Sequence, residues 1–367
     1  MFKAEELFQN VTDKNHPDET VLTIIQGKGT LPREQAGRNI HYDDASLSNY
    51  KKVEQGDFII HLRSFEGGLE MANEAGIVSP AYTILRCKRP HSSLFYDAYF
   101  HTDEFINHNL SKSVEGIRDG RQISYEAFEW LGIPYCEPTE QEKISNLFAA
   151  LNERIAKQRD LVESLKKYKR GLLMHYFSDD KTQLWTQCSV SQIGKVITGS
   201  TPPTNDRSNY DGDLLFCAPG DVGEQKYISS TEKRVSPKGF ALGRPLPPNS
   251  VIVTCIGLIG KLGIAKTSMI TNQQINALVV SEGFDHEFIY YAFENFFPEY
   301  RSKVSMQTLP ILSKSEFEKL MIKVPDLDVQ HKISSHLAAM DRRIEHTQQE
   351  LNALIEHRRG IMQQLFI

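Results

Sequence analysis

A stretch of 37 residues occurs twice in this chain of 367 residues, at positions 141–177 and again at 330–366. The two copies align without a gap at a constant offset of 189 positions, which chance does not produce. Whatever structure the first copy forms, the second is therefore expected to form as well. The identical pairs are Gln141/Gln330, Lys143/Lys332, Ile144/Ile333, Ser145/Ser334, Ala149/Ala338, Ala150/Ala339, Arg154/Arg343, Ile155/Ile344, Leu165/Leu354, Arg170/Arg359, Gly171/Gly360 and Phe177/Phe366.

Apolar residues within each copy are spaced alternately four and three positions apart. This is the spacing of a heptad seam, in which one side of a long helix packs against a partner helix. Each copy is therefore predicted to be one long helix. The seam positions are Ile144, Phe148, Leu151, Ile155, Val162, Leu165 and Leu172 in the first copy, and Ile333, Leu337, Met340, Ile344, Leu351, Leu354 and Ile361 in the second.

The ends of the predicted helices carry capping and charge signals. Thr139 and Asp328 can accept hydrogen bonds from the exposed N–H groups of a first turn. Gly171 and Gly360 are expected to weaken each helix just before its last turn. Basic residues gather near the opposite ends, where the helix dipole favours them, at Lys166, Lys167, Lys169, Arg170, Arg358 and Arg359.

The composition, with 40% hydrophobic and 24% charged residues, is typical of a soluble globular protein long enough for two domains with full cores. We find no run of about 18 apolar residues, and the first residues lack the basic-then-apolar order of a secretory signal. A cytoplasmic protein without a membrane partner is therefore expected. The net charge of −5 argues against a nonspecific polycation but not against specific DNA recognition.

The five cysteines are odd in number and widely spaced, with no CxxC pair and no histidine at ligand spacing beside them. Neither a disulfide framework nor a structural zinc site is expected. The sequence also lacks a convincing glycine-rich cofactor loop after a strand, and the segment 257–261 is too short for a phosphate-binding loop. We therefore expect neither a metal nor a cofactor.

The segments outside the repeat predict two globular regions of the same α+β class. Short β-like runs separated by Gly and Pro recur at 21–25, 57–62 and 82–85 before the first helix, and at 251–256 and 277–280 after it. These runs favour mainly antiparallel sheets. The expected division is a first domain at 1–138, a first helix at 139–178, a second domain at 179–325 and a second helix at 326–367.

The two globular regions also resemble each other weakly and in step. The chain is therefore predicted to be a tandem duplication in which the helices stayed similar and the domains diverged. On this hypothesis the helices share one task, and the domains perform two versions of another. The matching segments are 57–60 with 250–253, 66–68 with the neighbourhood of 260–263, 77–82 with 269–274, and Phe128 with Phe317.

A heptad seam must be buried, and the order of the chain favours burial of one helix against the other. An antiparallel pair forms an intramolecular coiled coil with pseudo-twofold symmetry and returns the chain to the first domain. If the midpoints align, Gln158 lies close to Thr347. Both occupy otherwise apolar seam positions, so we predict a central polar layer that fixes the register. The alternative, that both side chains lie at a wet edge, stays open.

The length of the helices suggests a purpose for the pair. A repeat of 37 residues at about 1.5 Å each gives a rod of roughly 55 Å. Two domains held on such a rod could reach successive major grooves of B-DNA, which lie about 34–36 Å apart on one face. The helix pair is therefore predicted to act as a spacer between two DNA-binding domains.

Several segments carry a resemblance to a known family. The helical repeats end in similar motifs at 169–177 and 358–366, and the second domain opens with Ile-Gly-Lys-Val-Ile-Thr-Gly-Ser-Thr-Pro-Pro at 193–203 and contains Thr-Asn-Gln-Gln at 271–274. In these segments the chain resembles the specificity subunit of type I restriction-modification systems, HsdS. The resemblance covers essentially the whole chain, although the first domain opens differently from the second.

The resemblance implies a noncatalytic protein. In that family each target recognition domain recognises one half of a split double-stranded DNA sequence, and the helices set the gap. Two methyltransferase subunits that use S-adenosylmethionine bind around the helices, and restriction subunits then join. Two diverged domains imply an asymmetric target. The residues agree with a noncatalytic role, because Pro202 and Pro203 follow Thr201 rather than the Asn or Asp of an amino-methyltransferase motif.

Polar and basic residues on turns are the candidates for DNA contact, because base edges are recognised by Arg, Lys, Asn and Gln, and phosphates by Lys, Arg, Ser and Thr. The alternatives are hydrogen bonding inside the fold for residues 272–274 and simple solvation for each basic residue of the first domain. The DNA-binding candidates are Lys28, Arg33, Arg38, Arg63, Arg118, Arg121, Thr201, Thr204, Arg207, Lys261, Gln273 and Gln274. The candidates for spacing and for binding the methyltransferase subunits are Arg154, Arg343, Arg170, Arg359, Gln158 and Thr347, together with the basic helix ends.

Two other functions stay open. The chain could be a protein-interaction scaffold whose helices dimerise with another chain, or the specificity module of a related single-chain methyltransferase-nuclease. The mass in solution separates the first alternative. A monomer with intramolecular helices favours DNA recognition, whereas a tight parallel homodimer favours a scaffold.

Overall fold

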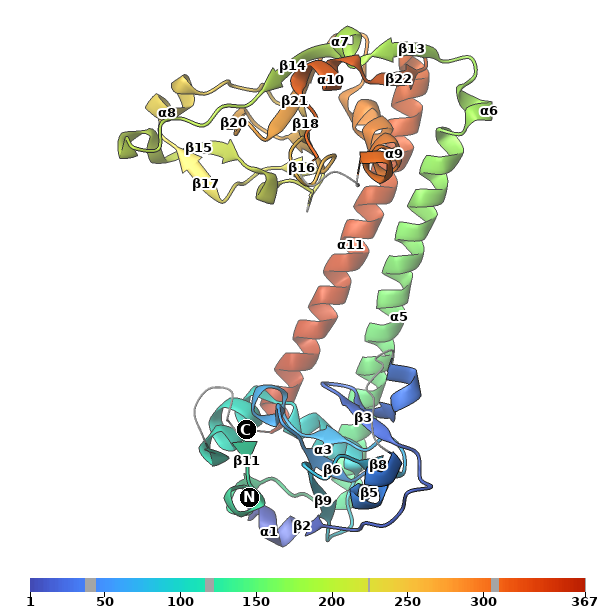
Figure 1. The fold of residues 1–367 in the computed structure, drawn as a ribbon, viewed down its shortest axis with the longest axis vertical. Coiled ribbons are helices and arrows are strands. Elements are labelled where there is room, and N and C mark those ends of the chain that lie inside the picture. Colours follow the sequence, from blue (N-terminus) through green and yellow to red (C-terminus); the bar gives the residue numbers. More distant parts are fainter. Residues whose placement is uncertain (37–43, 116–121, 224, 305–309, 367) are drawn as a thin grey trace. The chain divides into compact units, whose positions relative to one another are not determined.

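The computed structural model describes the chain apart from residues 37–43, 116–121, 224, 305–309 and 367 (Figure 1). Arg38, Arg118 and Arg121 lie outside the described residues. The chain divides into two compact units, Met1–Asp160 with Gln348–Ile367, and Leu161–Thr347. Each unit combines a globular part with half of each long helix. Among the described residues, no helix is both long and apolar enough to cross a membrane.

The repeated stretch forms two long α-helices, α5 (Pro138–Tyr176) and α11 (Leu327–Leu365), each of 39 residues. The heptad prediction of one long helix per copy is confirmed. Neither Gly171 nor Gly360 ends its helix. A glycine inside a helix costs about 1 kcal/mol relative to alanine, and packing along the seam offsets that cost.

The expected N-terminal caps of these helices are wrong. Thr139 and Asp328 both lie within the first turn rather than before it. Asp326 caps α11 instead, because its Oδ1 accepts a hydrogen bond from the Val329 N–H group at 2.9 Å. The sequence pattern located the helix to within two residues but did not distinguish between two nearby aspartates.

In the first unit the two half-helices run antiparallel. Phe148 of α5 stacks on Phe366, just beyond the end of α11, with ring centroids 6.3 Å apart. Further along α5, Gln158 Nε2 donates to Glu350 Oε2 at 2.8 Å. Residue numbers on α11 therefore fall as those on α5 rise.

The second unit repeats this arrangement. Lys169 Nζ lies 2.7 Å from Asp341 Oδ1, and the Tyr176 hydroxyl lies 2.5 Å from His336 Nδ1. The predicted antiparallel pairing is thus present in each unit. Every seam residue that the heptad pattern predicts is buried or half-buried, and none is exposed.

The globular part of the first unit is built on an antiparallel sheet with the order β2-β9-β6-β7. A hairpin, β3–β4, and a pair, β5–β8, form a second group of strands, which the parallel Val21–Ile77 bridge connects. The strands are β1 (Phe2–Lys3), β2 (Phe8–Val11), β3 (Leu22–Ile25), β4 (Gly29–Pro32), β5 (Lys51–Val53), β6 (Phe58–Ile60), β7 (Glu70–Met71), β8 (Gly76–Val78), β9 (Thr83–Cys87), β10 (Val114–Glu115), β11 (Gln122–Ile123) and β12 (Gly132–Ile133). The short helices are α1 (Ala4–Leu7), α2 (Ser64–Gly67), α3 (Ser93–Phe100) and α4 (Tyr125–Phe128), with η1 (Arg33–Ala36), η2 (Asp44–Asn49), η3 (Glu104–Asn109) and η4 (Leu110–Ser113).

The second unit has a sheet with the order β14-β21-β18-β19-β16, in which only β16 runs parallel to its neighbour. A further sheet has the order β17-β15-β20. The strands are β13 (Thr186–Ser189), β14 (Gly194–Thr198), β15 (Tyr210–Cys217), β16 (Tyr227–Ile228), β17 (Lys233–Val235), β18 (Val251–Thr254), β19 (Leu262–Ala265), β20 (Met269–Thr271), β21 (Ile275–Val280) and β22 (Met321–Val324). The helices are α6 (Asp179–Thr182), α7 (Val190–Ile193), α8 (Pro237–Leu242), α9 (His286–Val304) and α10 (Lys314–Lys319), with η6 (Arg207–Asn209) and η7 (Pro219–Asp221).

The two globular parts share a core strand order, β2-β9-β6-β7 in the first and β14-β21-β18-β19 in the second, which adds β16. Phe58 pairs with Leu85 in the first sheet, and Val251 pairs with Leu278 in the second, so residues 57–60 and 250–253 occupy the same strand. The strand pair β1–β12 likewise corresponds to β13–β22. The predicted α+β class is therefore confirmed, and the predicted match of 57–60 with 250–253 falls on equivalent strands.

The outer ends of the seams pack into the cores of the globular parts. Phe128 and Phe317, predicted to be equivalent, are both fully buried in their respective cores. The long helices are thus continuous with the cores and not separate from them. The core of the first unit includes Phe148, Met362 and Phe366 from the helix segments, and that of the second includes Leu173, Ile333 and Leu337.

Candidate nucleic-acid interface

The loop after β14 presents three of the predicted DNA contacts. Gly199 and Ser200 tie its start to the sheet, since their N–H groups donate to the carbonyls of Ile275 at 3.0 Å and Thr271 at 2.8 Å. A Cβ on Gly199 would lie 2.2 Å from the carbonyl oxygen of Asn272, so only glycine allows this close approach. The exposed side chains that follow are Thr201, Thr204 and Arg207.

The far part of this loop is held by side chains that bind its backbone. The Tyr210 hydroxyl donates to the Pro202 carbonyl at 2.6 Å, and Asn209 Nδ2 donates to that of Pro203 at 3.0 Å. Asp206 pairs with Lys238 at 2.7 Å, and the pair, with hydrogen bonds from Ser208, lowers the pKa of Asp206 to about 2. The loop therefore has a defined conformation, although its side chains face solvent.

Gln273 lies directly beside this loop. Thr201 Oγ1 donates to Gln273 Oε1 at 2.6 Å, and both side chains are exposed. The bond fixes the side-chain amide so that its Nε2 group is the part available as a donor. A donor fixed in this way suits the acceptor atoms that bases expose in the major groove.

Gln274 is half-buried and forms hydrogen bonds within the fold. Its Oε1 accepts from Asn272 Nδ2 at 3.1 Å, and its N–H group donates to Asn272 Oδ1 at 3.0 Å. The alternative of internal hydrogen bonding therefore describes Asn272 and Gln274, whereas Gln273 faces outward. In an extended segment successive side chains point to opposite faces, which also places Asn272 and Gln274 on one face and Gln273 on the other.

Lys261 belongs to the turn that follows β18. Its N–H group donates to Thr254 Oγ1 at 3.0 Å in the turn between β18 and β19. Its aliphatic chain packs beside Gly223, where an added Cβ would be 3.4 Å from Lys261 Cδ. The side chain is half-buried. The structure thus brings Thr201 and Gln273 together and places Lys261 beside the β15–β17 connection.

The basic candidates of the first unit lie on turns near β3 and β4. Lys28 is exposed in the turn between these strands, and Arg63 is exposed where α2 begins. The two elements touch, because the Gln26 side chain fills the space beside Gly67. Arg33, at the start of η1, is half-buried with its guanidinium 6.0 Å from the centre of the Tyr50 ring.

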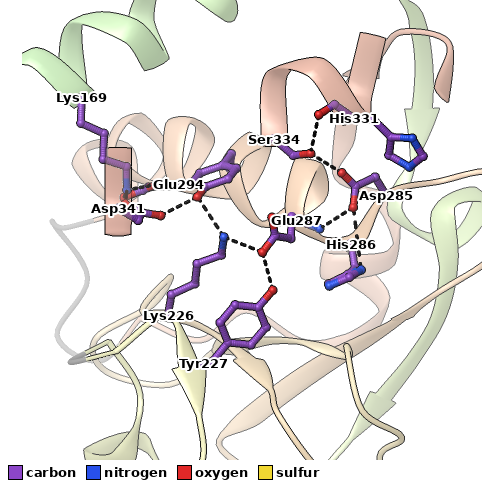
Figure 2. Close-up of polar contacts among 11 residues, drawn as sticks. Lys169, Lys226, Tyr227, Asp285, His286, Glu287, Glu294, His331, Ser334 and Asp341 are labelled. Atoms are coloured by element: carbon purple, nitrogen blue, oxygen red, sulfur yellow. Dashed lines mark hydrogen bonds and ion pairs between the residues drawn. The ribbon is translucent and has the colours of Figure 1, made fainter. Parts of the chain in front are cut away.

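A half-buried polar network in the second unit was not predicted from the sequence (Figure 2). Lys226, next to β16, donates from Nζ to Glu287 Oε1 and to the Tyr291 hydroxyl, both at 2.9 Å. The Tyr291 hydroxyl in turn donates to Asp341 Oδ2 of α11 at 2.5 Å. Burial, assisted by the nearby Asp341 carboxylate, raises the pKa of Tyr291, so this hydroxyl remains a donor. The network ties α9 to α11.

Lys169 completes the network from α5. Its Nζ lies 2.7 Å from Asp341 Oδ1 and 2.9 Å from Glu294 Oε2. Burial opposes the charge, but the two carboxylates outweigh it and raise the pKa of Lys169. Lys169 therefore does not belong to the outer basic surface predicted for the helix ends. By contrast Arg154, Arg170, Arg343 and Arg359 are exposed.

The predicted central layer is not decided by these contacts. Gln158 donates to Glu350 within the first unit, and Thr347 Oγ1, in the second, donates to the carbonyl of Arg343 at 2.7 Å. Thr347 is a polar residue at a seam position, and its side chain is buried, at 6% exposure. The pairing of Gln158 with Thr347 stays a prediction.

Comparison with known proteins identifies the type of domain. Residues 183–357 match the family model of the type I restriction modification DNA specificity domain. The MjaIX specificity subunit, a type I restriction enzyme subunit of Methanocaldococcus jannaschii, is 30% identical over 178 residues, which are 47% of this chain. Over this region the chain is similar to the specificity subunits of type I restriction enzymes. The matched region covers 41% of the MjaIX subunit, less than half of its length.

Solved specificity subunits have the same fold. The crystal structure of the HsdS subunit from Thermoanaerobacter tengcongensis matches with a TM-score of 0.52 and 17% identity, covering 100% of this chain and 95% of that one. The S subunit from M. genitalium matches with a TM-score of 0.61 and 14% identity, covering 100% and 95%. At these identities the likeness concerns the fold and not the individual contacts.

Proposed function

We propose that the chain is the DNA-recognition subunit of a type I restriction-modification complex. Each globular part recognises one half of a split, asymmetric DNA target. The helices α5 and α11 set the distance between the half-sites. The chain itself carries out no chemistry, and methylation and cleavage belong to its partner subunits.

The observation that carries this proposal is one fold present twice with different exposed loops. The shared core strand order gives both parts the same way to approach DNA. The loops do not repeat, since Thr201 and Gln273 form a bonded pair in the second unit, whereas the first unit presents Lys28 and Arg63. Two recognition domains with different exposed side chains recognise different sequences, which makes the target asymmetric.

The long helices supply the surface for partner subunits. Their seams are buried within the two units, so the seams are not available to another chain. Exposed arginines occupy equivalent places in the two repeats, Arg154 with Arg343 and Arg170 with Arg359. A duplicated surface fits two copies of one partner, a methyltransferase subunit that uses S-adenosylmethionine. Restriction subunits join this assembly, and the complex works in the cytoplasm.

Competition binding with three variants tests the DNA contacts. We expect Gln273→Ala and Arg207→Ala to alter sequence preference at one half-site, at about 1–3 kcal/mol for a contact to a base. Lys261→Ala, if it contacts phosphate, weakens all sequences alike and lowers the salt dependence. The experiment uses the full chain with its methyltransferase partner and a library of randomised duplexes. Wild-type preference and affinity in all three variants would contradict the assignment.

A further inference from the structure

The connection between β3 and β4 in the first unit differs in length from the connection between β15 and β17 in the second. In the first unit β3 continues to β4 through residues 26–28 alone, whereas in the second β15 continues to β17 through residues 218–232. The connections are equivalent, because β3 and β15 are joined in parallel to the same neighbouring strand. That joint is the Val21–Ile77 bridge in one unit and the Leu215–Met269 pair in the other.

The short turn of the first unit is held from beneath by a buried carboxylate. Glu70 on β7 is 0% exposed, and its two oxygens accept from the Gly27 N–H group at 2.6 Å and the Gly29 N–H group at 2.9 Å. Both glycines have positive φ, 73° and 77°, which lets two alternate N–H groups point toward one anion. Glu70 therefore fixes the backbone on either side of Lys28.

Asn73 holds the turn from a second direction. Its Nδ2 group donates to the carbonyl of Lys28 at 2.8 Å and to that of Thr30 at 2.9 Å. A Cβ on Gly29 would lie 2.5 Å from the Met71 carbonyl oxygen, so the turn lies flat against the chain after β7. The backbone of Lys28 is thus fixed while its side chain remains exposed.

The charge beneath the turn is compensated inside the unit. His101 Nε2 lies 3.3 Å from Glu70 Oε1, and His101 Nδ1 lies 2.8 Å from the Asp97 carbonyl oxygen. Burial opposes protonation, but the hydrogen bond to Glu70 and the nearby Asp97 carboxylate raise the pKa of His101. The negative charge of Glu70 is therefore balanced by His101. Glu70 bonds the backbone of the turn and does not pair with the Lys28 ammonium group.

The second unit has a glycine at the position equivalent to Glu70. The register places Gly263 of β19 where Glu70 stands in β7, since Ile59 pairs with Glu70 and Ile252 with Gly263. A Cβ on Gly263 would lie 2.6 Å from Ile228 Cδ1, so the space is filled by an apolar residue of the longer connection. The same sheet edge therefore supports a cationic turn in one unit and an extra strand in the other.

We propose that the turn of residues 27–29 is a phosphate-binding element of the first recognition domain, with Lys28 as the contact and Glu70 as its positioning residue. The inference rests on the proposed DNA-recognition function. The glycine N–H groups cannot themselves hold the phosphate, because Glu70 already occupies them. Only the ammonium group is offered, and a single ammonium is a point charge that suits a phosphate better than the two-acceptor edge of a base.

Binding of the full-length chain to mixed-sequence duplex DNA, measured over a series of NaCl concentrations, tests this inference. We expect Lys28→Ala to weaken binding to all sequences alike and to reduce the slope of log K against log salt concentration by about 0.9, the contribution of one phosphate. We expect Glu70→Gln to do the same, because the amide NH2 group meets an N–H donor. The double variant should bind no more weakly than Lys28→Ala alone.

Three controls separate positioning from general damage. Lys112→Ala removes another exposed lysine of the same unit and should keep the wild-type slope. Asn73→Ala loosens the turn while keeping Glu70 and should reproduce the loss seen in Glu70→Gln. Thermal unfolding of each variant shows whether the unit remains folded.

The outcomes distinguish this inference from the function on which it rests. A wild-type slope for Lys28→Ala would overturn the phosphate contact while leaving DNA recognition intact. Additive losses in the double variant would overturn the positioning role of Glu70. A wild-type chain that binds no duplex at any salt concentration would contradict DNA recognition and this inference with it.

Discussion

Gln141 and Gln330, which stand 189 positions apart, make the same two hydrogen bonds in their respective units. Gln141 Oε1 accepts from the Ser92 N–H group at 3.0 Å, and its Nε2 donates to the Cys136 carbonyl at 2.8 Å. Gln330 accepts from the Asp285 N–H group and donates to the Pro325 carbonyl, both at 2.9 Å. Each glutamine thus ties the start of a long helix to the start of a domain helix, α3 or α9.

This relationship predicts the effect of removing either glutamine. Gln330→Ala leaves the half-buried Asp285 N–H group and Pro325 carbonyl without this partner, at about 1 kcal/mol or more each, so we expect about 2 kcal/mol lower unfolding free energy. Gln141→Ala should lose a similar amount. Chemical denaturation measures both, with the exposed Gln349→Ala as the matched control. Variants as stable as Gln349→Ala would show that the tie does not support the fold.

The half-buried network around Lys169 predicts a stability loss that depends on pH. Lys169→Met leaves the Glu294 and Asp341 carboxylates without their shared cation, which should cost about 3 kcal/mol at neutral pH. Burial raises the pKa of Glu294 even beside Lys169, and removing the lysine raises it further. A raised carboxyl pKa reduces stability as pH rises above the ordinary value of 4.5, so the loss should shrink in acid.

The exposed neighbour Lys167→Met is the control for this experiment, because it lies on the same helix and faces solvent. Its unfolding free energy should match that of the wild type across the pH range. Partial recovery in the Lys169→Met/Glu294→Gln double variant is also expected. A loss in Lys169→Met that does not change with pH would argue against a charged pair.

The Glu70–His101 pair predicts a pH window for the stability of the first unit. Burial opposes ionisation of Glu70, but the bonds from His101, Gly27 and Gly29 lower its pKa below 4.5, so its stabilisation is lost as pH falls through that lowered pKa. The pKa of His101 is raised above 6.5, so its stabilisation is full below 6.5 and is lost as pH rises through the raised value.

Unfolding curves over a pH series check this window. His101→Gln should remove the loss on the alkaline side, and Glu70→Gln the loss on the acid side. Burial lowers the pKa of the neighbouring His61, so His61 adds a loss of stability of its own below pH 6.5, and this loss should remain in both variants. An unchanged alkaline limb in His101→Gln would show that another group controls it.

The buried seams predict the oligomeric state. Since the half-helices pack against each other within each unit, we expect the isolated chain to have the mass of a single copy in light scattering. The scaffold alternative requires the seams to pair with a second chain, and a tight homodimer would support it. Unchanged mass in Ile155→Asp with loss of stability would agree with an intramolecular seam, because Ile155 is 8% exposed.

The sequence predicted the long helices because their signal is local and occurs twice. Heptad spacing appears within a single stretch of chain, and the offset of 189 aligns both copies. Gln141 and Gln330 appeared in that alignment as identical residues, but their role depends on Ser92 and Asp285, which lie 49 and 45 positions away. The repeat therefore showed that Gln141 and Gln330 are equivalent, but not which groups they bind.

The candidate site was less predictable because its partners are distant in sequence. Glu70 accepts from Gly27 and Gly29, which are 43 and 41 positions away, and no pattern connects a buried glutamate to a glycine turn at that distance. Lys169 was grouped with its basic neighbours because helix charge patterns do not show which side a domain helix covers. Thr201 and Gln273 were both proposed as contacts, but not as a bonded pair 72 positions apart.

The central claim is that two different domains of one chain specify the two halves of one split DNA target. Methylation-sensitive sequencing of DNA from cells that express the chain with its methyltransferase partner tests it most directly, using the wild type and Gln273→Ala. We predict a bipartite, asymmetric methylated motif in which Gln273→Ala alters one half only and leaves the spacing unchanged. A continuous motif, or a change in both halves at once, would contradict the account.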